Sequence, residues 1–224
     1  MDPDRFAAEL PRLFDDFPRS EHPKERRFDD VVSGVPNLAQ ENNLALVNLA
    51  ASLLEPGESY VEAGTYMGAS LIAAMRRSEG KDFVAIDSFG FGPMEVKGRS
   101  LPKAGRKALE ANLSRFGAEG ATILEGDVFE LIRGGALTGR TVGVWYYDAA
   151  HDYESQLDAL RVIEPYLADR ALVLVDDSDW EEVARATRDY LASQPKARLL
   201  LEVQGAEHGQ PWWWEGMQAL AWQA

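Results

Sequence analysis

The stretch SYVEAGTYMGAS occupies residues 59–70 and joins an apolar strand to a helix through a glycine-containing turn. The strand is predicted over 59–63 and the helix over 69–77. In the turn between them, Gly64 and Gly68 let a ligand approach the backbone, and the start of the helix offers free N–H groups. This strand–turn–helix unit is typical of the ligand-binding edge of an α/β sheet.

The alternation of strand and helix continues along the chain. A helix over 38–54 precedes the unit, further strands are predicted at 83–86, 121–124, 142–147 and 171–175, and further helices at 102–116, 153–167 and 181–193. The last two strands, 198–203 and 218–222, are joined by a loop with no room for a crossover helix, so they form an antiparallel pair. We therefore expect an α/β fold, a Rossmann-like doubly wound sheet of seven strands, mostly parallel with an antiparallel C-terminal hairpin.

Composition narrows the class of protein. The chain has 224 residues, 46% of them hydrophobic, which suits one globular unit with a sizeable core. Residues 1–40 are rich in charge and proline and predict short helices and loops, a candidate lid on a main domain over 41–224. The net charge of −14 argues against a nucleic-acid partner, which clustered Lys and Arg would bind. The chain has no cysteine for disulfides or thiolate ligands and no apolar run of about 20 residues. We therefore expect a cytoplasmic protein with no membrane partner.

Two carboxylates follow strands beside the glycine turn. Asp87 ends the strand at 83–86, where it can accept hydrogen bonds from a ribose diol, and Asp127 follows the next strand, where it can meet an adenine amino group. A purely structural turn and a solvated loop aspartate are the alternatives. A dinucleotide is the weaker interpretation, because its Gly-x-Gly-x-x-Gly pattern needs a glycine where Tyr66 stands. Together the turn and the carboxylates indicate an adenosine-type cofactor.

A second group of carboxylates follows the two most apolar strands: Asp148, then Asp176 and Asp177. Bringing two carboxylates together costs about 4 kcal/mol at ~4 Å with an effective dielectric constant of about 20, and a divalent cation such as Mg²⁺ offsets that repulsion. Consecutive strand residues point to opposite faces, so Asp176 and Asp177 share one ion only if the strand has already ended. The alternative is that one of them caps the next helix.

His151 stands three residues after Asp148, at the predicted mouth of the site. Imidazole titrates near neutrality and suits the removal of a proton from a hydroxyl, so His151 is a candidate catalytic base. Asp148 is its main competitor for that role. A packed or surface histidine is the structural alternative.

The stretch from Val61 to Ser70 resembles the first motif of the class I S-adenosylmethionine-dependent methyltransferases, and the likeness extends from about Leu44 to the C-terminus. This resemblance implies that Glu62, Gly64 and Ser70 hold the methionine part of the cofactor. It also implies that Asp87 binds the ribose and that Asp127 lies on the adenine side. The full set of cofactor-binding residues that we expect is Glu62, Gly64, Thr65, Tyr66, Gly68, Ser70, Asp87, Ser88, Asp127, Val128 and Asp148.

The pattern Asp148-x-x-His151-x-Tyr-Glu, with the double aspartate that follows, is similar to the macrocin- and mycinamicin-type small-molecule O-methyltransferases. In that group the acids matching Asp148, Asp176 and Asp177 bind Mg²⁺ next to the acceptor hydroxyl, and the histidine matching His151 is a proposed base. Ala149 departs from the pattern, because many relatives have glycine there. The resemblance implies an S-adenosylmethionine-dependent O-methyltransferase of natural product biosynthesis, acting on a sugar, a glycoside or a phenol.

Other functions and partners stay open on the sequence. One alternative is a metal-dependent hydrolase or hydroxylase that uses the acidic cluster, and another is a noncatalytic cofactor-binding protein. The expected partners are a small-molecule acceptor and a second copy of the chain in a homodimer. The aromatic run Trp212-Trp213-Trp214 is an acceptor wall, a dimer contact or core packing, and the loop from Phe89 to Met94 is a second candidate lid or a mobile connector.

Overall fold

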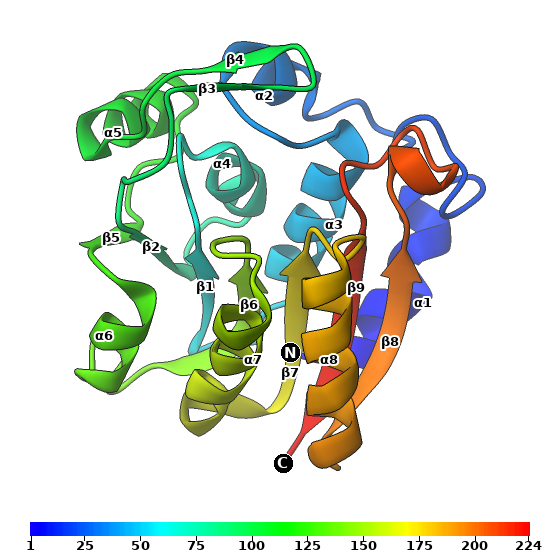
Figure 1. Cartoon of the computed structure of the whole chain (residues 1–224), viewed down its shortest axis with the longest axis vertical. Helices are drawn as coiled ribbons and strands as arrows, with labels where there is room; N and C mark the ends of the chain where they lie inside the picture. The colour runs from blue at the N-terminus through cyan, green and yellow to red at the C-terminus, as the bar shows by residue number, and fades with distance from the viewer.

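A single sheet organises the chain, and the computed structural model describes all of residues 1–224. The strands of the sheet are β1 (Glu58–Ala63), β2 (Asp82–Asp87), β5 (Thr122–Glu125), β6 (Thr141–Tyr147), β7 (Leu167–Asp176), β8 (Ala197–Val203) and β9 (Met217–Gln223). Their order is β5-β2-β1-β6-β7-β9-β8 (Figure 1). Only β9 runs antiparallel to its neighbours, β7 and β8. The predicted seven-stranded, mostly parallel sheet with an antiparallel C-terminal pair is confirmed.

The connections place a topological switch at the centre of the sheet. From β1 the chain moves outward through β2 to β5 on one side, then returns to β6 on the other side of β1. The loops that leave β1 and β6 therefore diverge at the carboxyl edge. Such a divergence is where ligands bind in open α/β sheets.

Helices cover both faces of the sheet (Figure 1). One face carries α1 (Pro3–Leu13), α2 (Asp29–Gly34), α3 (Glu41–Ser52), α4 (Ala69–Met75) and α5 (Arg106–Arg115). The other carries α6 (Val128–Arg133), α7 (Tyr153–Val162) and α8 (Glu181–Ser193). None of these helices is both long and apolar enough to cross a bilayer.

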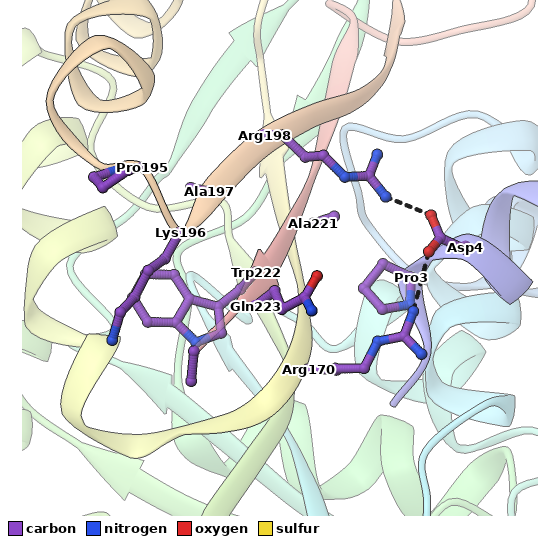
Figure 2. Close-up of a pocket in the computed structure, with 11 residues that line it drawn as sticks. Pro3, Asp4, Arg170, Pro195, Lys196, Ala197, Arg198, Ala221, Trp222 and Gln223 are labelled. Carbon is purple, nitrogen blue, oxygen red and sulfur yellow. Dashed lines mark hydrogen bonds and ion pairs between the residues drawn. The ribbon is translucent and has the colours of Figure 1, made fainter.

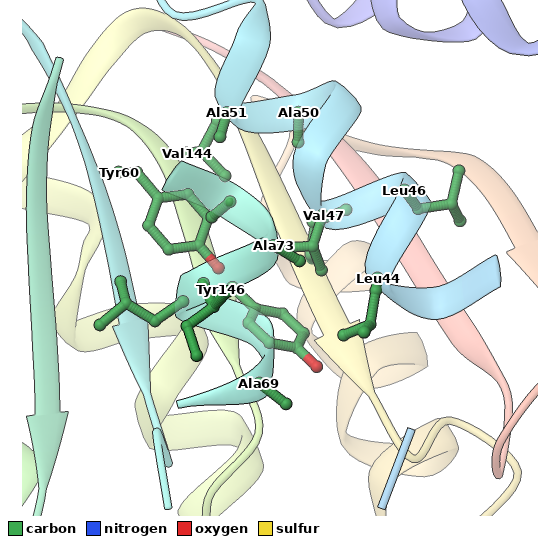
Figure 3. Close-up of a cluster of buried hydrophobic side chains, with 14 of the residues drawn as sticks. Leu44, Leu46, Val47, Ala50, Ala51, Tyr60, Ala69, Ala73, Val144 and Tyr146 are labelled. Atoms are coloured by element: carbon green, nitrogen blue, oxygen red, sulfur yellow. The ribbon is translucent and has the colours of Figure 1, made fainter. Parts of the chain in front are cut away.

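The core between α3, α4 and the sheet lies directly beneath the carboxyl edge. Leu44 and Val47 from α3 and Ala73 from α4 pack around the rings of Tyr60 and Tyr146, which come from β1 and β6 (Figure 3). All five side chains are almost completely buried. The two tyrosines keep their hydroxyl groups bonded to carboxylates, Tyr60 to Glu62 at 2.8 Å among them, so this core supports polar groups of the site from below.

Residues 1–40 share this core. Phe6, Phe14 and Phe28 have no more than 1% of their surface exposed and belong to the same cluster as the residues of α3 and α4. The ring of Trp213, from the loop before β9, lies 5.7 Å from the ring of Phe14. The lid role of this segment stays a prediction.

Two elements escaped the sequence analysis, and both had local signals. Helix α6 begins at Asp127, which caps it, and Glu130 three residues later completes a capping-box pattern. A hairpin of β3 (Met94–Val96) and β4 (Arg99–Leu101) forms in the glycine-containing loop. Its turn, Lys97-Gly98, has positive φ at both residues, as a two-residue hairpin turn requires, but Lys at the first position signals it less clearly than Asn or Asp.

Four predicted helices are shorter than expected, and those predicted over 38–54 and 69–77 span Glu41–Ser52 and Ala69–Met75. The helix predicted over 102–116 begins only at Arg106, because residues 102–104 run beside the glycine-containing loop and Ala104 donates to the Phe91 carbonyl. The helix predicted over 153–167 ends at Val162, and a 3₁₀ turn containing Pro165 leads into β7. Proline restricts the residue before it and removes a helical hydrogen bond, so the α-helix stops there.

Candidate functional site

A cavity of about 520 Å³ opens at the carboxyl edge, where β1 and β6 diverge. Most of the predicted cofactor-binding residues line it: Gly64, Thr65, Tyr66, Ser70, Asp87, Ser88, Asp127, Val128 and Asp148. Glu62 and Gly68 do not line this cavity. The structure therefore brings together residues that are up to 84 positions apart in the chain, from Gly64 to Asp148.

Gly64 allows the ends of β1 and β6 to approach each other. Its φ is +90°, and a Cβ at this position would lie only 1.6 Å from the Asp148 carbonyl oxygen. Asp148 N–H donates to the Ala63 carbonyl at 2.9 Å, which fixes the two loops together. Gly68 has a φ of +91° at the start of α4, where the side chain of Leu109 covers it. Only glycine combines this backbone conformation with such close packing.

Glu62 lies beneath the turn instead of on the cavity wall. Its carboxylate accepts hydrogen bonds from the hydroxyl groups of Tyr60 at 2.8 Å and Ser70 at 3.2 Å. Burial raises the pKa of Glu62 to about 7, although these hydrogen bonds oppose the rise. Thr65, in the turn itself, lines the cavity and has a buried hydroxyl group, which together with Tyr60 and Ser70 opposes the rise in the pKa of Glu62.

Asp87 and Asp127 are both held by backbone N–H groups. Asp87 accepts from Tyr66 N–H at 2.6 Å and from Phe89 N–H at 2.5 Å, one bond to each carboxylate oxygen. Asp127 accepts from Phe129 and Glu130 through Oδ1 alone, which leaves Oδ2 free. Asp127 is thus a helix cap as well as a cavity residue. Each carboxylate keeps lone pairs for a ligand.

Three side chains of the acidic group meet at one end of the cavity. Atoms of Asp148, His151 and Asp177 that can bind a metal all lie within 4.8 Å of one another. His151 Nε2 is 2.9 Å from Asp177 Oδ2 and 3.7 Å from Asp148 Oδ1. Asp177 reaches this point because β7 has ended at Asp176 and Asp177 adopts a positive φ of +52°, so the strand alternation no longer applies.

Asp176 points elsewhere in this structure. Its Oδ2 accepts the hydroxyl of Tyr146, and its Oδ1 accepts Asp177 N–H at 3.0 Å. The Tyr146 hydroxyl also lies 3.4 Å from Asp148 Oδ2, so it connects Asp176 to the cluster indirectly. The structure brings together two of the three predicted metal ligands, and the metal-binding role of Asp176 stays a prediction.

The charged groups of this cluster shift one another's pKa values. The cavity walls desolvate Asp148, and the neighbouring charge of Asp177 adds to this effect, so the pKa of Asp148 is raised although His151 opposes the rise. Burial also raises the pKa of Asp176 well above its ordinary value. For His151, burial acts to lower the pKa, but the carboxylates of Asp148 and Asp177 outweigh it and raise the pKa to about 10. Two carboxylates and an imidazole at this spacing fit a small divalent cation.

Part of the cavity wall comes from residues that the sequence analysis did not single out. They are Pro36, Asn37, Leu38, Ala39 and Leu44 on the N-terminal side, and Ile86, Gly126, Phe129, Tyr146, Tyr147, Ala150 and Ser155. Gly90 and Phe91, from the candidate lid loop at 89–94, and Ala149 line the cavity as well. Tyr147 could have been predicted to line the cavity, because it is the last residue of the strand predicted over 142–147 and so lies at the carboxyl edge of the sheet. Residues 36–39 carried none, because no local pattern ties them to this edge.

The β3–β4 hairpin and the run Trp212–Trp214 lie beside the N-terminal part of the cavity wall. Arg99 donates to the carbonyls of Asn37 at 3.1 Å and Ala39 at 3.0 Å, and its guanidinium lies 4.6 Å from the ring centre of Trp214. Trp213 is fully buried and Trp212 is 39% exposed. Of the three tryptophans, Trp213 is core packing and Trp214 supports the hairpin.

A second cavity, of about 320 Å³, lies at the opposite end of the sheet, near the chain termini. Figure 2 shows Arg170 and Arg198 both reaching towards Asp4, with which they form ion pairs. The two guanidinium groups are therefore already neutralised. Because this cavity lies away from the carboxyl edge and its arginines are paired, the first cavity is the candidate functional site.

Comparison with known proteins agrees with this fold. The model of the family described as "Methyltransferase domain" matches residues 61–178, more than half of the chain. No match was found among curated protein sequences.

Three solved structures illustrate the likeness of fold. Cofactor-bound Rv0187 from MTB is 19% identical, with 99% of this chain and 97% of that chain covered and a TM-score of 0.63. The calicheamicin methyltransferase CalS11 is 21% identical, with 99% and 93% covered and a TM-score of 0.58. The O-methyltransferase TomG from Streptomyces achromogenes, in complex with SAM, is 16% identical, with 100% of both chains covered and a TM-score of 0.60. With this fold and the family match over β1 to the end of β7, the chain belongs to the methyltransferase domain family.

Proposed function

We propose that this methyltransferase transfers a methyl group from S-adenosylmethionine to a hydroxyl group of a small molecule, assisted by a divalent cation. The observation that carries the proposal is the cavity at the carboxyl edge of β1 and β6, whose wall includes the cluster of Asp148, His151 and Asp177. A cofactor site and a site for an acceptor hydroxyl are thereby adjacent. TomG is described as a complex with SAM and PaMTH1 of Podospora anserina as bound to SAH, which supports the choice of cofactor.

We expect different residues of the cavity to bind different parts of the cofactor. We expect the segment from Gly64 to Ser70 to receive the methionine part, because Gly64 has no side chain to keep a ligand from the backbone and the first N–H groups of α4 have no partner within the helix. Asp87 and the free oxygen of Asp127 are placed to accept hydrogen bonds from the ribose and the adenine. When bound, S-adenosylmethionine supplies a methyl group on a positively charged sulfur. The acidic surroundings of the cavity favour that charge.

We expect the cluster of Asp148, His151 and Asp177 to act on the hydroxyl group of the acceptor. Methyl transfer forms an oxygen–carbon bond, breaks a sulfur–carbon bond and releases the hydroxyl proton to a base. A divalent cation, when bound by Asp148 and Asp177, supplies positive charge that lowers the pKa of a hydroxyl. His151 and Asp148 are the two groups placed to take the proton. The two carboxylates raise the pKa of His151 to about 10, so His151 is protonated at neutral pH when no cation is bound. A cation bound by those carboxylates would offset their negative charge and so remove the cause of the raised pKa.

Other readings of the acidic cluster are weaker. A metal-dependent hydrolase or hydroxylase is less favoured because the family model that matches residues 61–178 is that of a methyltransferase domain. A noncatalytic binding protein does not account for a histidine held between two carboxylates beside the cavity.

The proposal is tested by calorimetric titration of S-adenosylmethionine and of its demethylated product, with and without Mg²⁺. Asp87→Ala is expected to weaken both by about tenfold or more, because a hydrogen bond to a charged group contributes about 1.5–3 kcal/mol. Glu125→Ala is the matched control, since Glu125 ends the adjacent strand β5 beside Asp87 but is exposed and lies outside the cavity. Mg²⁺ added alone measures the cation site. No heat from either ligand with a folded protein would refute the proposed function.

A further inference from the structure

The hydroxyl group of Tyr146 lies between two carboxylates that the sequence predicts as ligands of a cation. It donates to Asp176 Oδ2 and lies 3.4 Å from Asp148 Oδ2. The side chain is only 3% exposed, and it lines the cavity together with the cluster of Asp148, His151 and Asp177. Tyr146 is the one side chain with hydrogen bonds to both Asp148 and Asp176, so it connects the cluster to an acid that stands outside it.

The register of β6 and β7 brings these three side chains together. Tyr147 pairs with Val175 at the carboxyl end of the two strands, so the residues that follow, Asp148 and Asp176, stand side by side. Side chains two residues apart in a strand point to the same face of the sheet. Tyr146 therefore lies one step below Asp148 on the same face, and its hydroxyl group reaches the level of both carboxylates.

The ring of Tyr146 gives this hydroxyl group a fixed position. In the buried core of Figure 3 the ring lies among side chains of α3 and α4, Leu44 and Ala73 among them. Asp148 and Asp177 have no comparable support, because they stand on the cavity wall and their like charges repel each other. A donor whose own position is fixed can hold the carboxylate of Asp148 in one orientation.

The orientation of Asp148 decides which of its oxygens is free. Oδ2 faces Tyr146, whereas Oδ1 lies on the side of His151, 3.7 Å from Nε2. Asp177 Oδ2 lies 2.9 Å from the same nitrogen, so it stands on the same side as Asp148 Oδ1. Metal ligands are oriented by hydrogen bonds on their far side, and removing such a partner typically lowers metal affinity about 10–100-fold. Tyr146 is placed to give Asp148 this support.

Strand β1 carries the same arrangement of tyrosine and acid away from the cluster. The Tyr60 hydroxyl donates at 2.8 Å to Glu62, two residues later in the strand, just as Asp148 follows Tyr146 by two residues. Both tyrosines are buried in the same core (Figure 3). Glu62 does not belong to the group of side chains that could hold a metal ion. Tyr60 is therefore a matched control for Tyr146.

We propose that Tyr146 is a positioning residue of the cation site, whose hydroxyl group holds Asp148 and Asp176 so that Asp148 presents Oδ1 to the cation. This inference rests on the proposed function, since it concerns a cation bound by Asp148 and Asp177. Tyr146 acts through the carboxylates and does not itself bind the cation.

The test measures cation binding without cofactor or acceptor. Mg²⁺ is titrated calorimetrically into wild type and into Tyr146→Phe and Tyr60→Phe, two variants that each lose one buried hydroxyl group and keep the ring. Tyr146→Phe is expected to weaken Mg²⁺ binding about tenfold or more, and Tyr60→Phe to leave it unchanged. Thermal unfolding without Mg²⁺ compares the folds, because a purely structural hydroxyl group affects the melting temperature but not the Mg²⁺ affinity of the folded protein.

A second measurement uses the wild-type side chain. The protein is labelled with deuterated tyrosine, and an infrared difference spectrum is taken between the Mg²⁺-bound and the Mg²⁺-free forms. A phenol C–O band is expected to shift, because Mg²⁺ offsets the charge of a carboxylate that faces the Tyr146 hydroxyl. The shift is expected to persist in Tyr60→Phe and to be absent from Tyr146→Phe. A spectrum of wild type without this shift overturns the inference even if Tyr146→Phe does not fold.

The titrations can overturn the inference as well. Mg²⁺ binding by Tyr146→Phe that equals that of wild type overturns it, and so does tighter binding, since Tyr146 would then keep Asp176 away from the cation. An equal loss in Tyr60→Phe also overturns it, because the loss of either buried hydroxyl group of this core would then suffice. If wild type binds no Mg²⁺, the cation of the proposed function itself fails, and that failure is recognised before any variant is compared.

Discussion

At the scale of single residues, the site is built from carboxyl groups that are buried and have little access to water. Glu62, Asp148 and Asp176 all have raised pKa values, and the hydroxyl groups of Tyr60 and Tyr146 donate to them. A neutral carboxylic acid is easier to bury than a carboxylate. Because these pKa values are raised, the stability of the fold depends on pH. The contribution of Glu62 can be measured apart from that of the cluster, because Glu62 lies below the cavity and does not touch the cluster.

Glu62→Gln is expected to flatten the pH dependence of stability. The folded pKa of Glu62 is about 7 and its ordinary value is 4.5, so between these values the folded protein holds a proton that the unfolded chain releases. Rising pH therefore favours unfolding, and wild type loses about 3 kcal/mol through this group as the pH passes from below 4.5 to above 7. Urea denaturation of both proteins at about pH 5 and pH 8 measures the difference. Equal slopes for the two proteins would contradict the raised pKa.

At the scale of elements, the turn after β1 decides whether the site forms. The turn meets the end of β6 so closely that the backbone of Asp148 occupies the space that any side chain at position 64 would need. The ends of β1 and β6 thus act as one unit, which carries the proposed cofactor residues on one loop and the proposed acceptor residues on the other.

Gly64→Ala is expected to destabilise the fold by at least about 3 kcal/mol, because a methyl group there collides with backbone and the φ of +90° disfavours alanine. Gly57→Ala is the matched control: its φ is +86°, but no atom lies within 4 Å of the added methyl group, so only about 1–2 kcal/mol is expected. Thermal unfolding of the two variants compares the costs. Similar melting temperatures would show that the β1 and β6 loops are not packed as described.

At the scale of the whole molecule, the two ends of the chain close the same side of the sheet. Trp213 packs on Phe14 at 5.7 Å and Phe17 at 5.8 Å between ring centres, and its indole N–H donates to the Pro18 carbonyl at 2.7 Å. The N-terminal segment and the loop before β9 therefore stabilise each other, and the segment delivers residues 36–39 to the cavity wall.

Trp213→Ala is expected to cost about 3–5 kcal/mol, as other losses of large buried aromatics do. For a chain of 224 residues, each kcal/mol lowers the melting temperature by about 2–4 °C. Trp212→Ala, one residue earlier in the same loop and exposed, is expected to cost less than about 1 kcal/mol. Calorimetric melting of the pair is the measurement. A small effect of Trp213→Ala would mean that the N-terminal segment is not anchored by this residue.

The strands of the sheet, and the stretch of chain that carries the candidate site, could be predicted from the sequence. Apolar strand runs separated by helices are local patterns, and all seven strands of the sheet formed within a few residues of the predicted bounds. The glycine turn and Asp87 were found for the same reason: they follow strands, and parallel strands end at one edge.

Which side chains meet at this edge of the sheet, and in what protonation state, follows from the packing of distant segments. The choice between Asp176 and Asp177 depends on where β7 ends and on one positive φ, the raised pKa of Glu62 depends on burial, and the cavity wall at Asn37 depends on contacts with Arg99. Exposure and side-chain direction arise from packing between segments far apart in the chain, so no local pattern contains them.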